Sequence, residues 1–418
     1  MEITRMSYSA RPENRQHKTK SLFKKIILYL FILILVGSPI IYAYLALTKP
    51  LPKLNPTITL SSVKDSVQPT MQWPSQGQAA VGSLEDGILA SSSEQTAVPI
   101  ASTAKVITAL AILKKKPFSS GQGETITLTQ KDVDIYNYYV SVNGSNTPVV
   151  NGEEISEYQA LEALMLPSAN NMADSLAIWA FGTIDSYVTY ANNLIRGFGA
   201  TNTKVADPSG FSPNTVSTAN DLILIGQQAL NHPILKQIVA EKEANIPAAG
   251  QIHNVNQLLG TKDIIGIKTG NTEEAGGCLL FAANHKIDGK YPITIIGAVV
   301  GQSNLGSAFQ STLSLLESVV QNFQQKTVLK AGTEIGYYSS KWGTKTLIYS
   351  KKDIIITGWK DLLYSMNTVL SDFNTPINSG TTVGTISISA SGQTATSSLV
   401  IKNSISSPSI IWRLLHYF

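Results

Sequence analysis

A serine and a lysine that lie one helical turn apart are the strongest sign of chemistry in this sequence. Ser102 and Lys105 fall in PIASTAKVITALAILKKKP, which begins like a turn and continues like an amphipathic helix. Their side chains would share one helix face, where the lysine amine, if neutral, could take the serine proton. Burial or a second nearby cation would lower the pKa of that lysine. The alternative is structural: Ser102 would be an N-cap and Lys105 a solvated lysine.

The S-x-x-K spacing becomes specific only through its context. It also occurs at Ser21 to Lys24 and at Ser61 to Lys64. The first of these precedes a long apolar run, and the second lies in a proline-rich segment with no helix pattern after it. Only Ser102 opens a helix behind two strand-like segments, QAAVGSL and GILAS. We therefore take Ser102 as the candidate nucleophile.

Two further motifs supply polar groups at element boundaries. GIKTGNT contains Lys268, Thr269 and Gly270 at the end of an apolar strand pattern, so that Lys268 is a candidate for the second cation. LPSANNMADSLA contains Ser168 and Asn170 at the start of a helix pattern. Each residue alone is well explained as a cap or turn residue, and S-x-N recurs elsewhere in the chain. Together, and in this order, the three motifs favour one active site.

The elements that must position these motifs indicate several domains. Prolines with scattered serine and threonine predict an extracytoplasmic linker over residues 48–75. Strand patterns, a helical block, three more strand patterns and a final helix predict an α/β domain with a helical lobe over residues 76–325. Alternating segments such as TISIS and KTLIYS predict a small all-β domain over residues 326–418. Its last segment, from Ser409 to Phe418, is expected either to contact a membrane or to pack on this β domain.

An apolar run near the N-terminus predicts a membrane span. Residues 26–47 include no charged residue over 22 positions. A helix rises about 1.5 Å per residue, so this run spans the roughly 30 Å hydrocarbon core of a bilayer. Because the run is long for a cleaved signal peptide, we interpret it as an uncleaved signal anchor. The basic residues before it predict a cytoplasmic N-terminus and an extracytoplasmic catalytic domain at the cell membrane.

Charge and composition exclude several classes of function. Residues 1–25 are expected to form a basic, cytoplasmic tail with a net charge of +5. Because the whole chain carries +4, the other residues together carry −1 and lack the excess of positive charge that nucleic-acid binding requires. A chain with 43% hydrophobic residues can bury full cores, which excludes global disorder. The single cysteine, Cys278, excludes an internal disulfide and is expected to be a small buried hydrophobe. The five histidines show no ligand spacing, so we predict no metal and no cofactor.

The three motifs resemble those of the penicillin-recognising serine enzymes, and most closely those of the low-molecular-mass penicillin-binding proteins that act as D-alanyl-D-alanine carboxypeptidases. The likeness covers roughly residues 76 to 325 and includes GEEISEYQALEALMLPSANNMADSLA and DPSGFSPNTVSTANDLILIGQQAL. It implies an antiparallel sheet flanked by helices, with a helical lobe and a β-rich C-terminal domain. It also implies two kinds of ligand: peptidoglycan stem peptides ending in D-Ala-D-Ala, and β-lactams.

The resemblance implies a role for each motif residue. Ser102 would be the nucleophile and Lys105 its general base. Ser168 would relay a proton to the leaving amine, and Asn170 would hold the substrate backbone.

The same resemblance assigns the KTG strand to substrate binding. Lys268 would supply positive potential, Thr269 would bond the terminal carboxylate, and Gly270 would leave room for the substrate. The backbone N–H groups of Ser102 and Asn271 would form the oxyanion hole. A threonine and a lysine at a strand edge also suit, on their own chemistry, a substrate that ends in a carboxylate.

Three functions remain open at this point. A D,D-carboxypeptidase would remove the terminal D-Ala through an acyl-enzyme, and a D,D-endopeptidase would apply the same chemistry to cross-links. A β-lactam sensor or inactive binding module would acylate and stop, although a sensor needs a cytoplasmic effector. The segment DPSGFSPNTVS lacks the glutamate that deacylates class A β-lactamases, so we expect slow hydrolysis of a bound penicillin. We assign no catalytic role to Asp207 or Asp221, which are typical of turns and caps.

Overall fold

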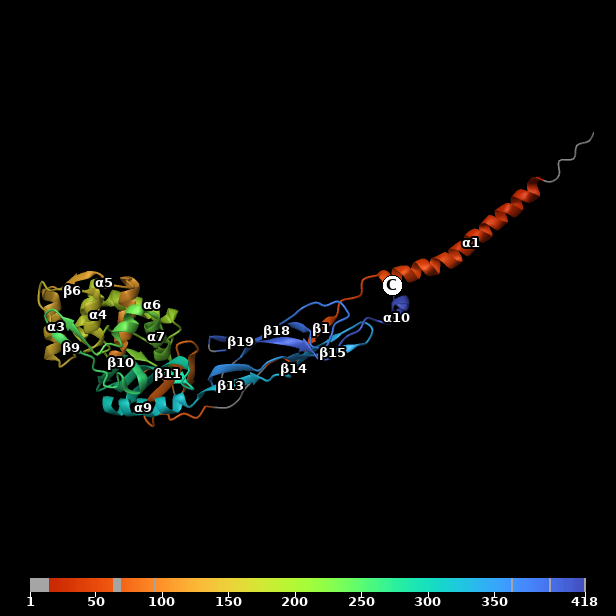
Figure 1. Cartoon of the computed structure of the whole chain (residues 1–418). Coiled ribbons are helices and arrows are strands. Elements are labelled where there is room, and N and C mark those ends of the chain that lie inside the picture. Colours follow the sequence, from red (N-terminus) through yellow and green to blue (C-terminus); the bar gives the residue numbers. More distant parts are fainter. Residues whose placement is uncertain (1–14, 63–68, 94, 362–363, 391, 417–418) are drawn as a thin grey trace, which may run out of the picture.

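The first and last helices of the chain lie beside each other, with two domains between them in the sequence. The computed structural model describes residues 15–62, 69–93, 95–361, 364–390 and 392–416. Helix α1 (Arg15–Thr48) lies at one end of an elongated molecule, an all-strand domain follows, and a domain of helices and strands forms the other end (Figure 1). The last helix, α10 (Ile410–Leu415), comes back beside α1. The domain of helices and strands, which contains the three motifs, therefore lies at the end opposite to α1.

A five-stranded antiparallel sheet forms the centre of the α/β domain. Its strands, in order across the sheet, are β10 (Ile264–Thr272), β11 (Gly276–Ile287), β12 (Tyr291–Gln302), β2 (Gln78–Ser83) and β3 (Gly87–Ser91). All five strand predictions for this domain are confirmed. Because β10 is an edge strand, one side of its backbone is left without a strand partner in this sheet.

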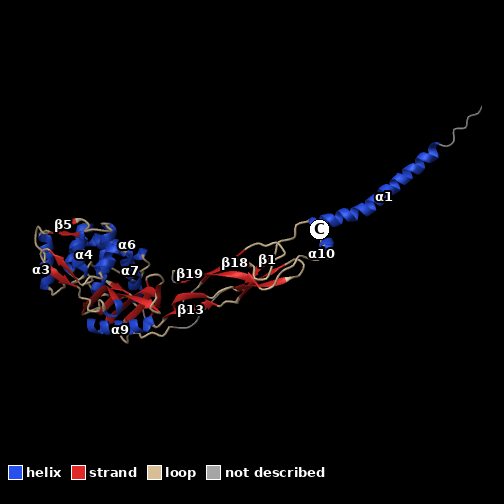
Figure 2. Ribbon diagram, viewed as in Figure 1, coloured by secondary structure: helices blue, strands red, loops and turns tan. Residues whose placement is uncertain are grey.

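Helices cover both faces of this sheet, as Figure 2 shows. Successive residues of a strand point to opposite faces, which divides the core into two clusters. Ala79 and Val81 share one cluster with α9 (Leu305–Val320), whereas Ala80 belongs to the other, with α7 (Ala219–Asn231). The sequence prediction of an α/β fold with a helical lobe is confirmed.

The helical lobe lies on the α7 side and carries two of the three motifs. Capping fixes the start of several helices: Ser156 and Gln159 form a capping box, and Thr218 accepts a hydrogen bond from the backbone N of Asp221 at 3.1 Å. The remaining helices of the domain are α2 (Lys105–Lys115), α3 (Gln130–Ser141), α4 (Glu157–Met165), α5 (Asn170–Phe181), α6 (Ile184–Gly197) and α8 (Pro233–Ile238).

Short strands and turns connect these helices. They are β4 (Val98–Pro99) paired with β7 (Val216–Ser217), β5 (Thr125–Thr127) paired with β6 (Glu154–Ser156), β8 (Glu243–Ile246) paired with β9 (Gly250–His253), and the 3₁₀ turns η1 (Ala101–Ala104) and η2 (Thr261–Asp263).

The β domain consists of two antiparallel sheets around a core of its own. The larger sheet has the order β1 (Asn55–Ile58), β14 (Glu334–Ser339), β15 (Lys345–Ser350), β19 (Gln393–Ile401), β18 (Thr382–Ala390) and β17 (Ser365–Leu370). The smaller one pairs β13 (Phe323–Leu329) with β16 (Ile354–Trp359). Phe323 and Trp359 join the α9 cluster, so they link the two domains.

The segment expected to be a linker, residues 48–75, is in part built into both domains. Asn55–Ile58 pairs with β14 as an edge strand, a position in which Pro56 is tolerated. Leu54 is buried in the β-domain core, and Met71 and Trp73 pack on the core of the α/β domain. Residues 63–68 of this segment lie outside the described residues. The prolines indicated a linker, but local composition did not indicate that part of it would pair with β14 as a strand.

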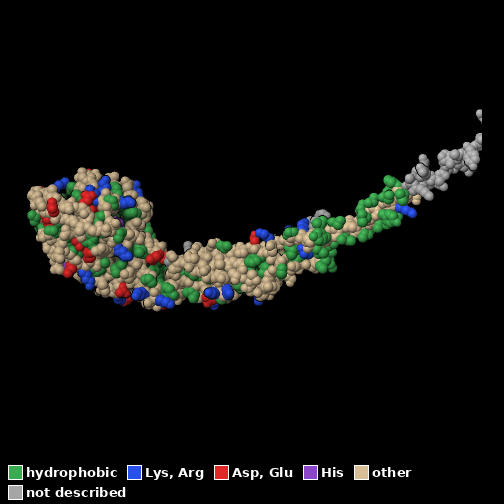
Figure 3. Space-filling model, turned by 45° about the horizontal axis from the view of Figure 1, so that its top comes forward, with side chains coloured by type: hydrophobic (Ala, Val, Ile, Leu, Met, Phe, Trp, Pro, Cys, Tyr) green, Lys and Arg blue, Asp and Glu red, His purple; other side chains and the backbone are tan. Residues whose placement is uncertain are grey.

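Helix α1 is apolar and stands away from the folded domains. An 18-residue stretch within Ser21–Thr48 has a mean hydropathy of 2.5, so the helix is long and apolar enough to cross a membrane. Hydrophobic side chains cover most of its coloured length in Figure 3. Most of the expected cytoplasmic tail, residues 1–14, lies outside the described residues.

Close packing between β11 and β12 leaves no room for a side chain at one glycine position. Gly297 faces Phe281 across the two strands, and a methyl group at Gly297 would overlap the fully buried Phe281 ring. We expect Gly297→Ala to lower the free energy of unfolding by about 1–3 kcal/mol. Thermal unfolding of the purified protein measures this loss. The control is Gly197→Ala, at an exposed position with open space, where we expect no loss; equal stabilities of the two variants would contradict the packing argument.

Candidate active site

Ser102 lies in a 3₁₀ turn rather than at a helix N-cap. The turn η1 precedes α2, whose N-cap residue is Ala104, and no side chain caps either element. The Ser102 Oγ lies 2.8 Å from the Nζ of Lys105. The structural alternative of a capping serine beside a solvated lysine is therefore wrong, because Lys105 is fully buried and in contact with the serine hydroxyl.

Three oxygen atoms surround the Lys105 amine. Besides Ser102, its Nζ donates to the Oδ1 of Asn170 at 2.7 Å and to the carbonyl oxygen of Ser209 at 2.8 Å. A neutral amine has two N–H bonds, which these two acceptors satisfy, and one lone pair, which then faces the Ser102 hydroxyl. A protonated amine can donate to all three oxygens in the same place. The proton of Ser102 can therefore move to Lys105 without a change of partners.

The surroundings of Lys105 favour its neutral form. Burial lowers its pKa well below the ordinary value, and the nearby charge of Lys268 lowers it further. Asp207 and Asp174 act in the opposite direction. Lys268 is itself buried, and burial lowers its pKa to about 7. Its Nζ donates to the carbonyl oxygen of Thr269 at 3.2 Å. The sequence-predicted second cation is thus close enough to act on the first.

The S-x-N motif comes to the site at the start of α5. Asn170 is the first residue of this helix, and its backbone N donates to the carbonyl oxygen of Ser145 at 2.7 Å. Ser168 has a φ of 66°, in the left-handed region that non-glycine residues rarely adopt. Its hydroxyl is buried and has no hydrogen-bond partner among the described residues. Such strain and an unsatisfied hydroxyl are typical of functional positions.

The KTG motif lies on the edge strand β10, directly against the serine turn. An added Cβ at Gly270 would lie 2.9 Å from the carbonyl oxygen of Ile100 and 3.0 Å from the backbone N of Ser102. Gly270 therefore lets two backbones approach each other closely, besides any room that it leaves for a ligand. Thr269 is buried beside it, and Asn271 is exposed.

A loop that sequence analysis left without a catalytic role supports the site. The carboxylate of Asp207 accepts hydrogen bonds from the backbone N of Phe211 at 2.9 Å and from the hydroxyls of Ser209 and Thr215. These bonds hold the Ser209 carbonyl against Lys105. Sequence analysis missed this carbonyl, although the turn signal DPSG could have indicated a fixed backbone there.

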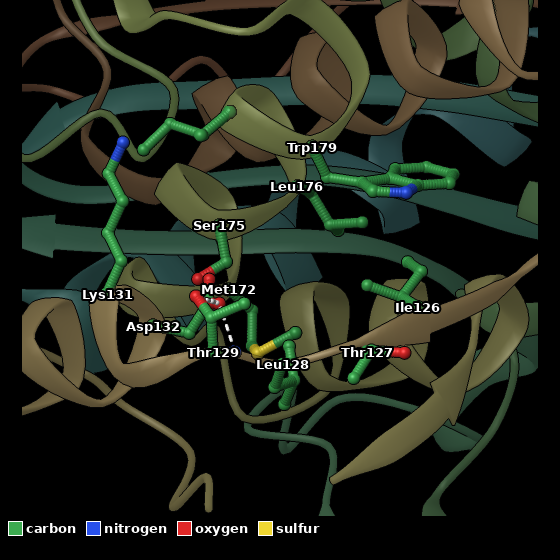
Figure 4. Close-up of a pocket in the computed structure, with 11 residues that line it drawn as sticks. Ile126, Thr127, Leu128, Thr129, Lys131, Asp132, Met172, Ser175, Leu176 and Trp179 are labelled. Atoms are coloured by element: carbon green, nitrogen blue, oxygen red, sulfur yellow. Dashed lines mark hydrogen bonds between the residues drawn. The ribbon is translucent and has the colours of Figure 1, made fainter. Parts of the chain in front are cut away.

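Another cavity lies on the far face of α5. It measures about 170 Å³ and lies between α5 and the β5–α3 segment, with Met172, Ser175, Leu176 and Trp179 lining one wall (Figure 4). At 100° per residue these side chains occupy the face of α5 opposite to Asn170. This cavity is therefore separate from the Ser102 site.

Comparison with protein families and curated proteins identifies relatives of the chain. A family model described as D-alanyl-D-alanine carboxypeptidase matches residues 68–302. The D-alanyl-D-alanine carboxypeptidase DacA of Escherichia coli is 28% identical, over 58% of this chain and 61% of that protein. A D-alanyl-D-alanine endopeptidase of Pseudomonas aeruginosa is 30% identical, over 51% of this chain and 68% of that protein. The chain thus spans somewhat less than two thirds of the Escherichia coli relative.

Solved structures show the same fold. The D-alanyl-D-alanine carboxypeptidase DacD from Francisella tularensis aligns over 82% of this chain and 96% of its own, with a TM-score of 0.58 and 20% identity. A D-alanyl-D-alanine carboxypeptidase from Mycobacterium tuberculosis aligns over 60% of this chain and 95% of its own, with a TM-score of 0.52 and 28% identity.

The buried Lys268 makes stability depend on pH. Its pKa is about 7 in the folded protein and near 10.4 when unfolded, so between these values only the unfolded chain holds the proton. Stability should therefore rise with pH from about 7 to 10, by roughly 1–3 kcal/mol between pH 7 and 9. Thermal unfolding of the wild type should show this rise, and Lys268→Met should show less of it.

The matched control is Lys286→Met, which removes an exposed lysine from β11 in the same sheet. It should keep the wild-type pH dependence. If Lys268→Met also keeps it in full, Lys268 is not the group that loses its proton on folding.

Proposed function

Because this chain belongs to the D-alanyl-D-alanine carboxypeptidase family, we propose that it removes the terminal D-alanine from peptidoglycan stem peptides through an acyl-enzyme on Ser102. The observation that carries this proposal is the fully buried Lys105 amine, 2.8 Å from the Ser102 hydroxyl. A buried amine with a lowered pKa beside a hydroxyl is suited to general-base catalysis. β-Lactams would acylate the same serine.

Acylation starts with transfer of the Ser102 proton to the neutral Lys105 amine. The Ser102 Oγ then attacks the carbonyl carbon between the two D-alanines, and the carbonyl oxygen becomes an oxyanion. The backbone N–H groups of Ser102 and Asn271 receive this oxyanion. The C–N bond breaks as the leaving amine takes a proton, which passes from Lys105 through the Ser168 hydroxyl. The free, buried state of that hydroxyl supports this relay.

Deacylation uses the same base in the same place. Lys105, neutral again after giving up its proton, takes a proton from a water molecule that attacks the ester carbon. The ester bond breaks, and the Ser102 oxygen recovers a proton from Lys105. Since the partners of Lys105 suit both of its protonation states, neither half-reaction requires the lysine to move.

Substrate recognition is proposed to depend on the edge strand β10. A peptide lying along β10 would extend the sheet, with the amide of Asn170 on its other side. Thr269 and Lys268 would bind its terminal carboxylate, and such a charge-assisted bond contributes about 1.5–3 kcal/mol. This carboxylate preference favours a carboxypeptidase over an endopeptidase, which acts within a longer peptide.

We further propose that α1 spans the cell membrane once, with the catalytic domain outside. Seven basic residues precede the uncharged run, and the positive-inside rule then places the N-terminus in the cytoplasm. The β domain would lie between the bilayer and the catalytic domain.

Covalent labelling with fluorescent penicillin tests the roles of Ser102 and Lys105. Ser102→Ala should abolish labelling, and Lys105→Arg should slow it by about 10²- to 10⁴-fold, because a guanidinium stays protonated near neutral pH. Lys114→Arg, an exposed lysine on the same helix, is the control and should label within a few fold of wild type. A folded Lys105→Arg variant that labels as fast as this control would remove Lys105 as the base.

Release of D-alanine from a peptide substrate, measured on the same protein samples, tests the proposed carboxypeptidase activity. The wild type should release it from a pentapeptide ending in D-Ala-D-Ala at roughly ten times the rate, or more, seen with the C-terminally amidated peptide. Equal turnover of both peptides would contradict the carboxylate argument. Normal penicillin labelling without any D-alanine release would instead point to a binding module.

Protease accessibility tests the topology. Protease added to intact spheroplasts should digest the catalytic domain and leave the N-terminal tail intact. Digestion of residues 1–25 with a protected catalytic domain would show the opposite orientation.

A further inference from the structure

The cavity on the far face of α5 contains a buried polar group without a partner. Ser175 lines this cavity and is only 5% exposed. Its Oγ makes no hydrogen bond within the part of the chain that the structure describes. Native proteins leave few buried hydroxyls unpaired, because such a group has lost its bonds to water. The Ser175 hydroxyl is therefore available to pair with a bound molecule.

The rest of the cavity wall is mainly apolar. Five large side chains contribute to it: Ile126, Leu128, Met172, Leu176 and Trp179. Figure 4 shows Trp179 and Ile126 on one side of the cavity and Ser175 on the other. A water molecule needs about two to four polar partners, whereas an apolar cavity of about 150 Å³ stays dry and binds benzene. With about 170 Å³ of space, this cavity suits one six-membered ring better than water.

Fixed contacts hold the two walls of the cavity apart. On the α3 side, a capping box fixes the start of the helix. On the α5 side, the Lys116 amine lies over the Trp179 ring, 4.9 Å from its centroid. Tyr139 of α3 donates to the carboxylate of Asp174 on α5 at 2.9 Å, which fixes the spacing of the two helices. These contacts oppose a collapse of the side chains into the void.

The charges around the cavity favour an uncharged ligand. Of the described residues that line it, two are charged, Lys131 and Asp132, and their charges are opposite. A net charge on the ligand would thus be buried without a matching counter-charge. An alcohol can both donate and accept, so it can pair with the Ser175 Oγ whichever way the serine proton points.

We propose that this cavity binds a small neutral alcohol with one six-membered ring, its ring between Met172 and Trp179 and its hydroxyl on the Oγ of Ser175. The proposal rests on the structure of the helical lobe and is independent of the proposed activity. It does reach the active site, because α5 begins with Asn170, whose Oδ1 accepts from Lys105 at 2.7 Å. A molecule held against α5 would restrain the helix that carries this contact.

Fluorine NMR of the full-length protein in detergent tests the proposal with two matched probes. 4-Fluorophenol has the ring and the hydroxyl, whereas fluorobenzene has the ring alone. Titration gives a dissociation constant for each probe, after subtraction of the binding to micelles without protein. The wild type should bind both probes. Ser175→Ala should weaken 4-fluorophenol by about fivefold or more, because the buried hydroxyl of the probe loses its partner, and leave fluorobenzene within about twofold.

Two further variants control this comparison. Ser175→Leu places a larger apolar side chain in the void and should abolish the binding of both probes. Ser314→Ala, at an exposed serine of α9, is the matched control and should bind both probes like the wild type. Thermal unfolding checks that each variant is folded. Because Ser175→Ala removes only an unpaired hydroxyl, it should be as stable as the wild type, and the test does not depend on Ser175→Leu.

Three results would overturn the proposal. Binding of neither probe to the wild type would show a closed or water-filled void. An equal effect of Ser175→Ala on both probes would show an apolar void without a polar contact. Equal affinities of Ser175→Ala and Ser314→Ala for 4-fluorophenol would place this probe elsewhere on the protein.

Discussion

The burial of one lysine amine is the constraint on which the active site depends. A charged Lys105 in the interior is costly, so the protein surrounds its Nζ with three oxygen atoms, from Ser102, Asn170 and Ser209. These oxygens come from a 3₁₀ turn, the start of α5 and a loop before α7. Three separate segments of the chain therefore meet at this amine. The same burial lowers its pKa, which suits the lysine to its proposed role as the general base.

Close approach of backbones is the second requirement, and glycine meets it on both sides of the serine turn. Gly270 lets the edge strand β10 approach Ile100 and Ser102, while a side chain at Gly210 would overlap the carbonyl oxygen of Ala101. With φ values of 45° and 66°, Ala101 and Ser168 lie in the left-handed region, which is unfavourable for residues with a side chain. The rigid sheet and the buried helices around them hold this strain at the site.

Two segments that lie far apart in the sequence meet at the C-terminal end of α1. The segment after α1 supplies β1 to the six-stranded sheet, and the end of the chain supplies α10, which contacts α1. The β domain is thus joined to α1 by two segments of chain rather than by one flexible connection. With the proposed membrane span of α1, this arrangement would hold the catalytic domain at a distance from the bilayer.

Local patterns in the sequence determined the apolar helix α1, the five strands of the central sheet and the three motifs that carry Ser102, Asn170 and Lys268. Such features depend on neighbours within one or two turns or on strict alternation, which a sequence displays directly. Only the tertiary structure decided that the Ser209 carbonyl would hold Lys105, that Asn55–Ile58 would become a strand of the distant β domain, and that α10 would dock on α1. These contacts join residues 104, about 280 and 372 positions apart. No local period encodes such pairings, because they arise when separate apolar surfaces are buried together and bring distant backbones within hydrogen-bonding reach.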